Sequence, residues 1–295
     1  MNRTLAMLCL IAAMTMTGAN VPVAKRLVTA FEPETLLALR FALATVVLVP
    51  LAHAESGPRL ADLSARQWRS IAILGVVGSV MFTWFILAGV QRTSAASAGI
   101  ILSALPAVVA LIGFARGDRP RFADVAMIGL AVVGVALVQV HTMHDGASGH
   151  DSLPGNLLVL MAVLCEAAFV IAARRISAEV APMRLCLGVA LVSLLATLPG
   201  ALATADTARL VAVPAATWAL FAGYVLTSSV LCTWLWYLGV RHVEPWATGL
   251  ATAAVPVAAL ATSVFAFAEM ASALQVAGAA LVVAAIASGT LVGRR

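Results

Sequence analysis

A single carboxylate lies in the middle of a long apolar stretch of the sequence. Glu166 is the twelfth residue of the apolar run 155–174, roughly 12 Å along a helix from Arg174 at its end. If this run spans a membrane, a charge at that depth is costly and usually faces the interior of a helix bundle or water. Glu166 could therefore bind a substrate ammonium group or exchange a proton during transport. A neutral, hydrogen-bonded structural carboxyl is the alternative.

Polar residues in the first apolar run could line the same pathway. Thr17 and Asn20 form a polar strip on one helical face, and Pro22 follows where it would loosen the helix end. An Asn inside a membrane must find partners across helices or in a cavity. We favour the cavity. Arg40, only about six residues into its run, has a stem long enough to reach the membrane surface, and we favour that position over a contact with Glu32, Glu34 or a substrate carboxylate.

Aromatic residues recur at matching positions of two runs. Trp84 and Trp234 both follow a Thr, and Tyr237 extends the face of the second. Such rings could gate a cavity or stack on a substrate, although aromatic residues also line membrane interfaces without a further role. The interface explains three other tryptophans better: Trp218, Trp236 and Trp246.

Small residues precede two prolines at helical spacing. Proline removes one helical hydrogen bond, and the freed backbone is tolerated in a membrane only against protein or a water-lined cavity. We interpret these faces as cavity walls with hinges at the prolines; simple packing of helices through small residues is the alternative. The wall residues are Gly99, Ser103, Gly249 and Thr252, and the hinges are Pro22, Pro106 and Pro256.

The composition places all these residues in a membrane. The chain is 62% hydrophobic and only 11% charged, with a mean hydropathy of +1.03, whereas soluble domains carry about 25% charged residues. Its basic residues lie singly or in pairs between apolar runs, which argues against nucleic-acid binding. All four cysteines lie within apolar runs without metal spacing, and the histidines and aspartates of 141–151 match no zinc motif, so no metal or cofactor is expected.

Ten apolar runs are long enough to cross a bilayer as helices. The sequence therefore predicts an all-α integral membrane protein with ten transmembrane helices, the first of them an uncleaved span. The predicted spans are 4–23, 34–53, 69–90, 94–115, 122–141, 155–174, 183–203, 215–239, 246–267 and 272–292.

The sequence repeats itself. Residues 83–106 and 233–256 share seven identical positions at one offset, among them Thr83/Thr233 and Gly99/Gly249. Two homologous halves, 1–148 and 149–295, follow from this repeat. Because each half contains five spans, an odd number, the second half must cross the membrane in the opposite sense. The prediction is two inverted five-helix repeats around a central cavity.

Basic residues are unevenly distributed between the two ends of the predicted spans. Thirteen of the 18 lie at the end where the first span begins, four lie at the other end, and Arg40 lies within a span. By the positive-inside rule, both termini are expected in the cytoplasm of a multi-pass protein, which we place in a bacterial inner membrane.

Taken together, these features resemble the EamA-type, ten-helix members of the drug/metabolite transporter superfamily. The resemblance covers the whole chain and rests on the repeat, the two Pro-containing small-residue helices and several single residues: Gly18, Asn20, Pro22, Lys25, Pro33, Arg40, Glu269, Gln275 and Gly278. It implies a basket of ten helices around a central cavity and transport of small metabolites without ATP hydrolysis. YddG-like members are broad amino-acid exporters.

The expected function is therefore secondary active or facilitative transport by alternating access, with export of amino acids or similar small metabolites. The expected partners are a small-molecule substrate, protons and the lipid bilayer, and the expected assembly is a monomer. Export or import of a drug or another metabolite is the alternative within the same superfamily. A non-transporting scaffold is disfavoured, and so is an intramembrane enzyme, since the sequence contains no HExxH, GxSxG or Walker motif.

Overall fold

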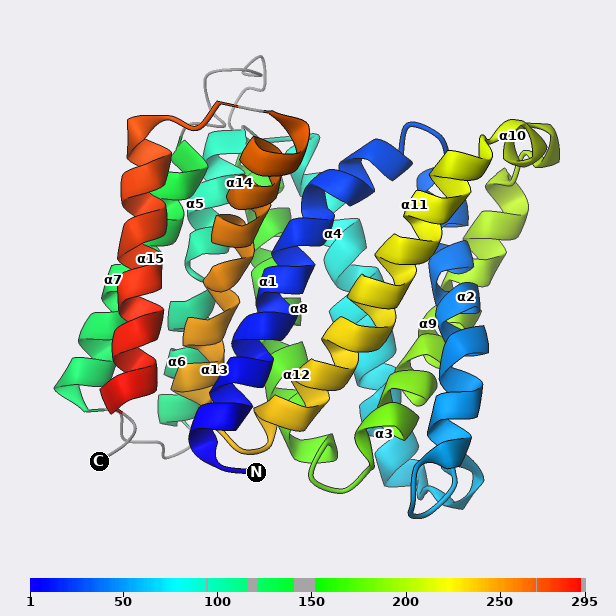
Figure 1. The fold of residues 1–295 in the computed structure, drawn as a ribbon, viewed down its shortest axis with the longest axis horizontal. Coiled ribbons are helices and arrows are strands. Elements are labelled where there is room, and N and C mark those ends of the chain that lie inside the picture. Colours follow the sequence, from blue (N-terminus) through cyan, green and yellow to red (C-terminus); the bar gives the residue numbers. More distant parts are fainter. Residues whose placement is uncertain (94, 116–120, 141–151, 269, 293–295) are drawn as a thin grey trace.

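The computed structural model describes residues 1–93, 95–115, 121–140, 152–268 and 270–292. Over these residues the chain is an all-helical bundle (Figure 1), with ten stretches long and apolar enough to cross a membrane. Each overlaps its predicted span along most of its length. The prediction of an all-α membrane protein with ten spans is confirmed.

Six spans are single helices and four are interrupted. The single ones are α1 (Arg3–Leu27), α2 (Pro33–Ala54), α7 (Phe122–Val140), α8 (Leu153–Ile176), α9 (Pro182–Thr204) and α15 (Ala273–Val292). The third span is α3 (Ala65–Gly75), the π-helical turn η2 (Val76–Met81) and α4 (Phe82–Val90). The eighth is α11 (Ala215–Val225), the π-helical turn η4 (Leu226–Leu231) and α12 (Cys232–Val240). The fourth is α5 (Ala95–Ser103) and α6 (Leu105–Ala115), and the ninth is α13 (Pro245–Thr252) and α14 (Ala254–Phe267). Two short helices lie in connections, η1 (Leu60–Asp62) and α10 (Thr207–Ala212).

Helix starts follow local chemistry. The side chain of Asn2 accepts a hydrogen bond from the backbone N–H of Leu5 at 2.8 Å, and Ser64 forms a capping box with Gln67 at the start of α3. Proline occupies the first position of α2, α9 and α13, where its missing N–H costs no helical hydrogen bond. These devices fix where the chain enters each span.

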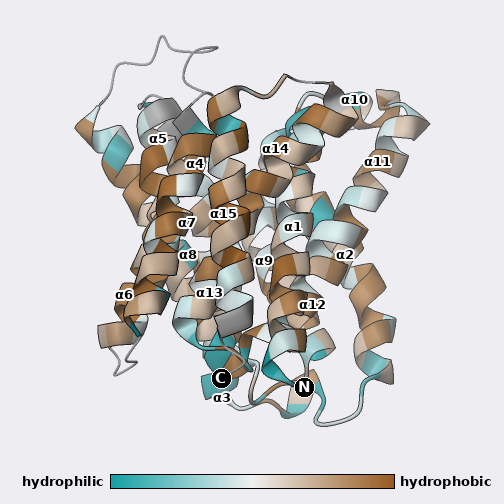
Figure 2. Ribbon diagram, turned by 60° about the vertical axis from the view of Figure 1, so that its left-hand side comes forward, coloured by the Kyte–Doolittle hydropathy of each residue, from teal (hydrophilic) through white to brown (hydrophobic). Residues whose placement is uncertain are grey.

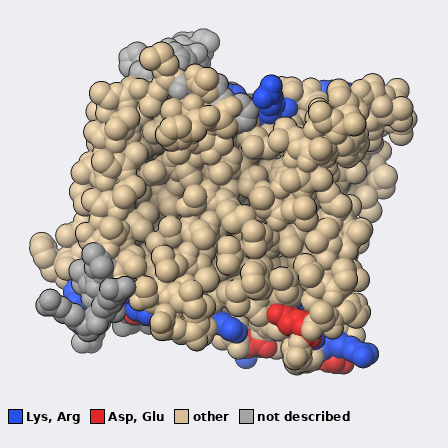
Figure 3. Space-filling model, viewed as in Figure 1, with Lys and Arg blue, Asp and Glu red and all other residues tan. Residues whose placement is uncertain are grey.

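Charged residues on the outer surface lie toward the two ends of the bundle. We call the end where α1 begins the N-terminal side and the other end the far side. Figure 2 shows hydrophilic residues concentrated toward the ends of the helices, and Figure 3 shows Lys, Arg, Asp and Glu only near the ends of the visible face, with an uncharged band between them. This band is the surface that a bilayer core of about 30 Å would cover.

Helix contacts recur when each helix is replaced by its counterpart five spans away in the chain. α1 packs on α12 and α14, while α8, five spans later, packs on α4 and α6; α7 packs on α15, and α2 on α9. Glycines make the closest crossings possible: a Cβ at Gly134 would lie 2.8 Å from the carbonyl oxygen of Gly278, and one at Gly278 would lie 2.6 Å from that of Gly134. Backbones meet directly at this α7–α15 crossing, as small residues allow in membranes.

Candidate functional site: a cavity between the spans

A cavity of about 600 Å³ lies within the bundle, and nine of the ten spans, all except α15, contribute residues to its lining. This size suits a small organic ligand. Its wall is mainly apolar, with Phe82, Ile86, Leu102 and Phe169 among the lining side chains. Polar groups interrupt this wall at a few places, and these groups define what the cavity can bind.

Two parts of the cavity wall are built from equivalent residues of the two sequence repeats. On η2 and α4 the cavity is lined by Ser79, Phe82, Thr83 and Ile86. On η4 and α12 it is lined by the residues exactly 150 positions later: Ser229, Cys232, Thr233 and Trp236. Both stripes have the i, i+3, i+4, i+7 spacing of one helical face. In both, the Thr hydroxyl donates to the Ser carbonyl oxygen four residues earlier.

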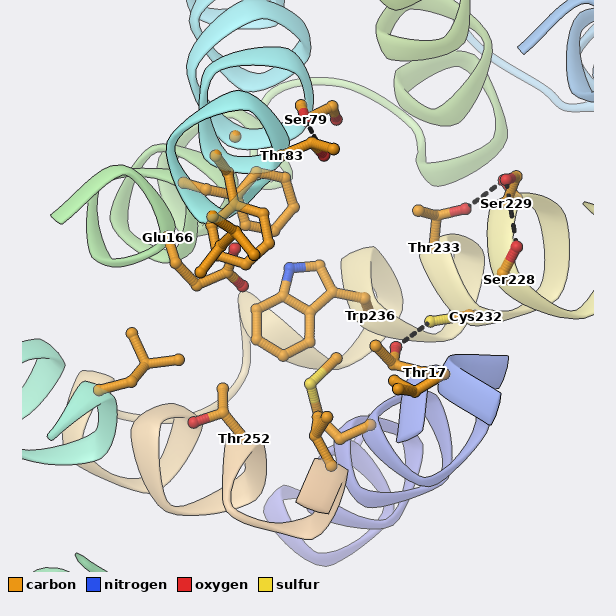
Figure 4. A pocket seen from close by; sticks show the side chains of 18 of the residues that line it. Thr17, Ser79, Thr83, Glu166, Ser228, Ser229, Cys232, Thr233, Trp236 and Thr252 are labelled. Carbon is orange, nitrogen blue, oxygen red and sulfur yellow. Dashed lines mark hydrogen bonds between the residues drawn. The ribbon is translucent and has the colours of Figure 1, made fainter. Parts of the chain in front are cut away.

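Glu166 enters this cavity from α8. It lies on the same face as Val163 and Phe169, one turn to either side, and is half-buried. Within the described part of the chain, its carboxylate makes no ion pair or hydrogen bond (Figure 4). A carboxylate held in an apolar wall without a protein partner can bind a cationic ligand or exchange a proton.

Arg40 faces the same cavity from α2, so the prediction that it reaches the membrane surface is wrong. Its Nε donates to the hydroxyl of Ser229 at 2.6 Å, and its Nη1 donates to the hydroxyl of Tyr224 at 3.2 Å. The guanidinium carbon also lies 5.4 Å from the centre of the Tyr224 ring. These contacts hold the charge inside the bundle, where it supplies a positive group to a cavity that also contains Glu166.

Five other predicted residues line the cavity. Thr17 shares a hydrogen bond with the thiol of Cys232 at 3.0 Å and also donates to the carbonyl oxygen of Ala13. Thr252 lines it at the end of α13, and Tyr237 on α12. Pro106 and Pro256 line it just after the breaks at Ala104 and Ala253 that divide the fourth and ninth spans. Whether these breaks act as hinges remains a prediction.

The prediction that Asn20 lines the cavity is wrong. Asn20 is buried, its Nδ2 donates to the carbonyl oxygen of Met16, and its Oδ1 accepts from the hydroxyl of Thr227 on η4 at 3.1 Å. It therefore joins two helices, which is the alternative considered for it. Pro22 lies within the continuous α1 and outside the cavity lining.

The tryptophan predictions are reversed. Trp84 is 61% exposed and packs edge-on against Phe85, while Trp234 is half-buried against the hydrophobic core; neither lines the cavity. Each is rotated about 100° from the neighbouring Thr that does line it. Trp236, which the interface seemed to explain, is buried and forms part of the wall. Trp236 lies three residues after Thr233 and so shares its helical face. This spacing is the sequence signal that could have identified Trp236 as a wall residue.

The small residues of the fourth and ninth spans mostly serve packing. A Cβ at Gly99 would lie 2.9 Å from the Gln139 side chain, and one at Gly249 would lie 3.0 Å from the carbonyl oxygen of Pro106. Ser103 is buried and donates to the carbonyl oxygen of Ile100. Of these helices' predicted wall residues, only Thr252 borders the cavity.

Some residues singled out in the sequence lie outside the described residues: Glu269 and the loop with His141, His144, Asp145, His150 and Asp151. Over the ranges that the structure describes, no group of three or more His, Cys, Asp or Glu side chains is arranged to hold a metal ion.

Comparison with known proteins identifies the family. The EamA-like transporter family matches residues 4–140 and 153–288. The chain is 30% identical over 261 residues to the uncharacterized transporter YetK of Bacillus subtilis (strain 168), covering 86% of this chain and 77% of that protein. It is 25% identical over 278 residues to the uncharacterized transporter YyaM of the same organism, covering 93% and 90%. A solved crystal structure with 21% identity superposes with a TM-score of 0.80 over 100% of this chain and 99% of its own, and so shares the fold. This chain belongs to the EamA-like transporter family, within the drug/metabolite transporter superfamily.

Proposed function

We propose that this protein is a secondary transporter that exports amino acids or similar small metabolites across the bacterial inner membrane by alternating access. The observation that carries the proposal is the cavity itself, which combines a carboxylate that forms no ion pair with the described residues, a guanidinium and an apolar wall. Glu166 would bind the substrate ammonium group or a proton, and Arg40 would attract the carboxylate. The apolar wall would accommodate the rest of the molecule.

We propose that residues 1–148 and 149–295 act as two inverted halves. Several structural features support this relation. The π-helical turns Val76–Met81 and Leu226–Leu231 lie 150 residues apart, and the breaks of the fourth and ninth spans match to within one residue. Exchanging the halves turns the contacts of α1 with α12 and α14 into those of α8 with α4 and α6, and it turns the α7–α15 and α2–α9 pairs into themselves. In Figure 1, α1 rises from the N-terminal side whereas α8 descends toward it. Two such halves can rock about a shared site.

We assign the N-terminal side to the cytoplasm. Of the described basic residues outside the cavity, nine lie on that side: Arg3, Arg59, Arg66, Arg69, Arg121, Arg174, Arg175, Arg184 and Arg241. Four lie on the far side: Lys25, Arg26, Arg92 and Arg209. This bias follows the positive-inside rule. A monomer suffices for the proposed function, because one chain supplies the cavity walls.

A second candidate substrate class is an organic cation, including cationic drugs. Glu166 is the one acidic side chain among the described residues that line the cavity, and Phe169 and Trp236 lie beside it. A carboxylate next to aromatic rings is suited to a desolvated cation.

Flux into proteoliposomes tests the proposal. Radiolabelled amino acids, organic cations and nucleosides would be presented with and without a pH gradient, and empty liposomes would serve as the control. We expect saturable flux of one or more amino acids that a pH gradient alters. Flux of organic cations without amino acids would replace the proposed substrate with the second candidate. Flux of nothing above empty liposomes would contradict amino-acid transport.

A further inference from the structure

Equivalent residues of the two halves differ in burial at opposite ends of the bundle. Leu87 on α4 is 45% exposed, while its equivalent Tyr237 on α12 is fully buried. Ile100 on α5 is 52% exposed, while its equivalent Leu250 on α13 is fully buried. α12 ends and α13 begins at the N-terminal side, whereas α4 ends and α5 begins at the far side. The junction at the N-terminal side is therefore the more tightly packed one.

An aromatic cluster lies at the tightly packed end. The ring of Trp236 stacks on that of Phe169, with centroids 6.2 Å apart, and Tyr237 lies 6.5 Å from Phe169. Trp236 and Tyr237 border the cavity, and both are almost completely buried. Their equivalents in the first half are Ile86 and Leu87, so the first half does not repeat this pair of polar aromatics.

Both aromatic residues contain a buried polar atom without a partner. Among the described residues, neither the indole N–H of Trp236 nor the hydroxyl of Tyr237 finds a hydrogen-bond partner. In Figure 4 the indole nitrogen of Trp236 points toward the side of the cavity from which Glu166 enters. A buried donor without an acceptor is costly compared with the same donor in water. This packed arrangement is therefore less stable than the apolar contacts of the rings alone would make it.

We propose that Trp236, Tyr237 and Phe169 form the gate that closes the N-terminal side of the cavity. The two unpaired donors make the closed gate easier to open. When this end opens, water reaches both donors and the cost of burying them is removed, while closing restores the apolar contacts of the rings. The proposal deepens the alternating access proposed above and rests on it.

The test uses a buried cysteine at about the depth of the gate. Cys186 borders the cavity, one turn into α9 from the N-terminal side, and is buried. With Cys9, Cys165 and Cys232 replaced by Ala, a membrane-impermeant thiol reagent applied at the N-terminal side reports how often the gate opens. Tyr237→Phe removes the unpaired hydroxyl and keeps the ring. We expect labelling about tenfold slower than in the parent, together with a higher melting temperature in detergent. Trp236→Phe removes the unpaired indole N–H and should also slow labelling.

The control for Trp236→Phe is Trp234→Phe. It makes the same substitution at a residue that follows the wall residue Thr233 but does not itself line the cavity, so it should leave the labelling rate unchanged. Labelling needs no substrate, so it separates the gate from the choice of solute. If Tyr237→Phe folds and is labelled as fast as the parent, the proposed gate is wrong even where the parent transports amino acids. If the parent itself is never labelled from this side, the opening of this end is refuted, and alternating access with it.

Discussion

Replacement of Glu166 by Gln is expected to reduce pH-gradient-driven accumulation of substrate by at least tenfold, an estimate that corresponds to about 1.4 kcal/mol of lost coupling. Gln has nearly the same shape but cannot bind and release a proton. No other acidic side chain among the described residues lines the cavity, so no neighbour can take over the exchange. The measurement is uptake of labelled substrate into proteoliposomes at several pH gradients.

Glu179→Gln provides the matched control. Glu179 is exposed at the N-terminal side and pairs with Arg66 at 3.2 Å, an interaction of little energetic weight at a surface. This variant should retain the full pH dependence. Unchanged pH-driven accumulation in Glu166→Gln, at normal expression, would show that Glu166 does not couple transport to protons.

Gly18→Ala is expected to be the most destabilising single methyl addition in the bundle. A Cβ at Gly18 would lie 2.1 Å from the carbonyl oxygen of Val255, and 2.8 Å from the Cβ of Ala258, where α1 crosses α14. The obstacle is backbone, so the helices themselves must separate. We expect a loss of about 3 kcal/mol or more, seen as a lower melting temperature in detergent.

Gly129→Ala makes the same substitution in the exposed interior of α7, where a Cβ would meet nothing within 4 Å. Ala is the better helix former by roughly 0.5–1 kcal/mol, so this variant should be as stable as the parent or slightly more so. Opposite signs at the two positions are the expected result. Equal melting temperatures for both variants would contradict the close α1–α14 crossing.

The spans could be predicted because the thickness of a bilayer fixes the length of an apolar helix. The repeat also predicted which residues are equivalent, and Thr83 and Thr233 do occupy matching positions of the cavity wall. Glu166 could be placed because a carboxylate in a span has few tolerable environments. These inferences depend on the position of a residue along its span and on the composition of that span, and both can be read directly from the sequence.

Rotation of a helix about its own axis was harder to predict. In a membrane both the lipid-facing and the protein-facing sides of a helix are apolar, so hydrophobicity does not show which side faces the core. Trp84 and Trp234 match each other in the repeat, but the match says nothing of the direction in which either ring points. They lie one position from the wall residues and face elsewhere.

Contacts between residues far apart in the chain were also beyond sequence reasoning. The partner of Asn20 is Thr227, and the Arg40 guanidinium is held by Ser229 and Tyr224; none of these pairs has a local sequence signal. Arg40 lies near the start of its span, which suggested the membrane surface. The packing of α2 beside α9 and η4 turns it into the bundle instead.

Counterflow in proteoliposomes tests the central claim most directly. Vesicles loaded with unlabelled substrate at high concentration receive trace labelled substrate outside, with no ion gradient. A site that opens alternately to the two sides predicts a transient accumulation of label inside, above its equilibrium level. The abundant unlabelled substrate occupies the site when it faces inward, so it returns the site to the outside and keeps labelled molecules from leaving. Label that only equilibrates, at a rate independent of the internal substrate, would contradict alternating access.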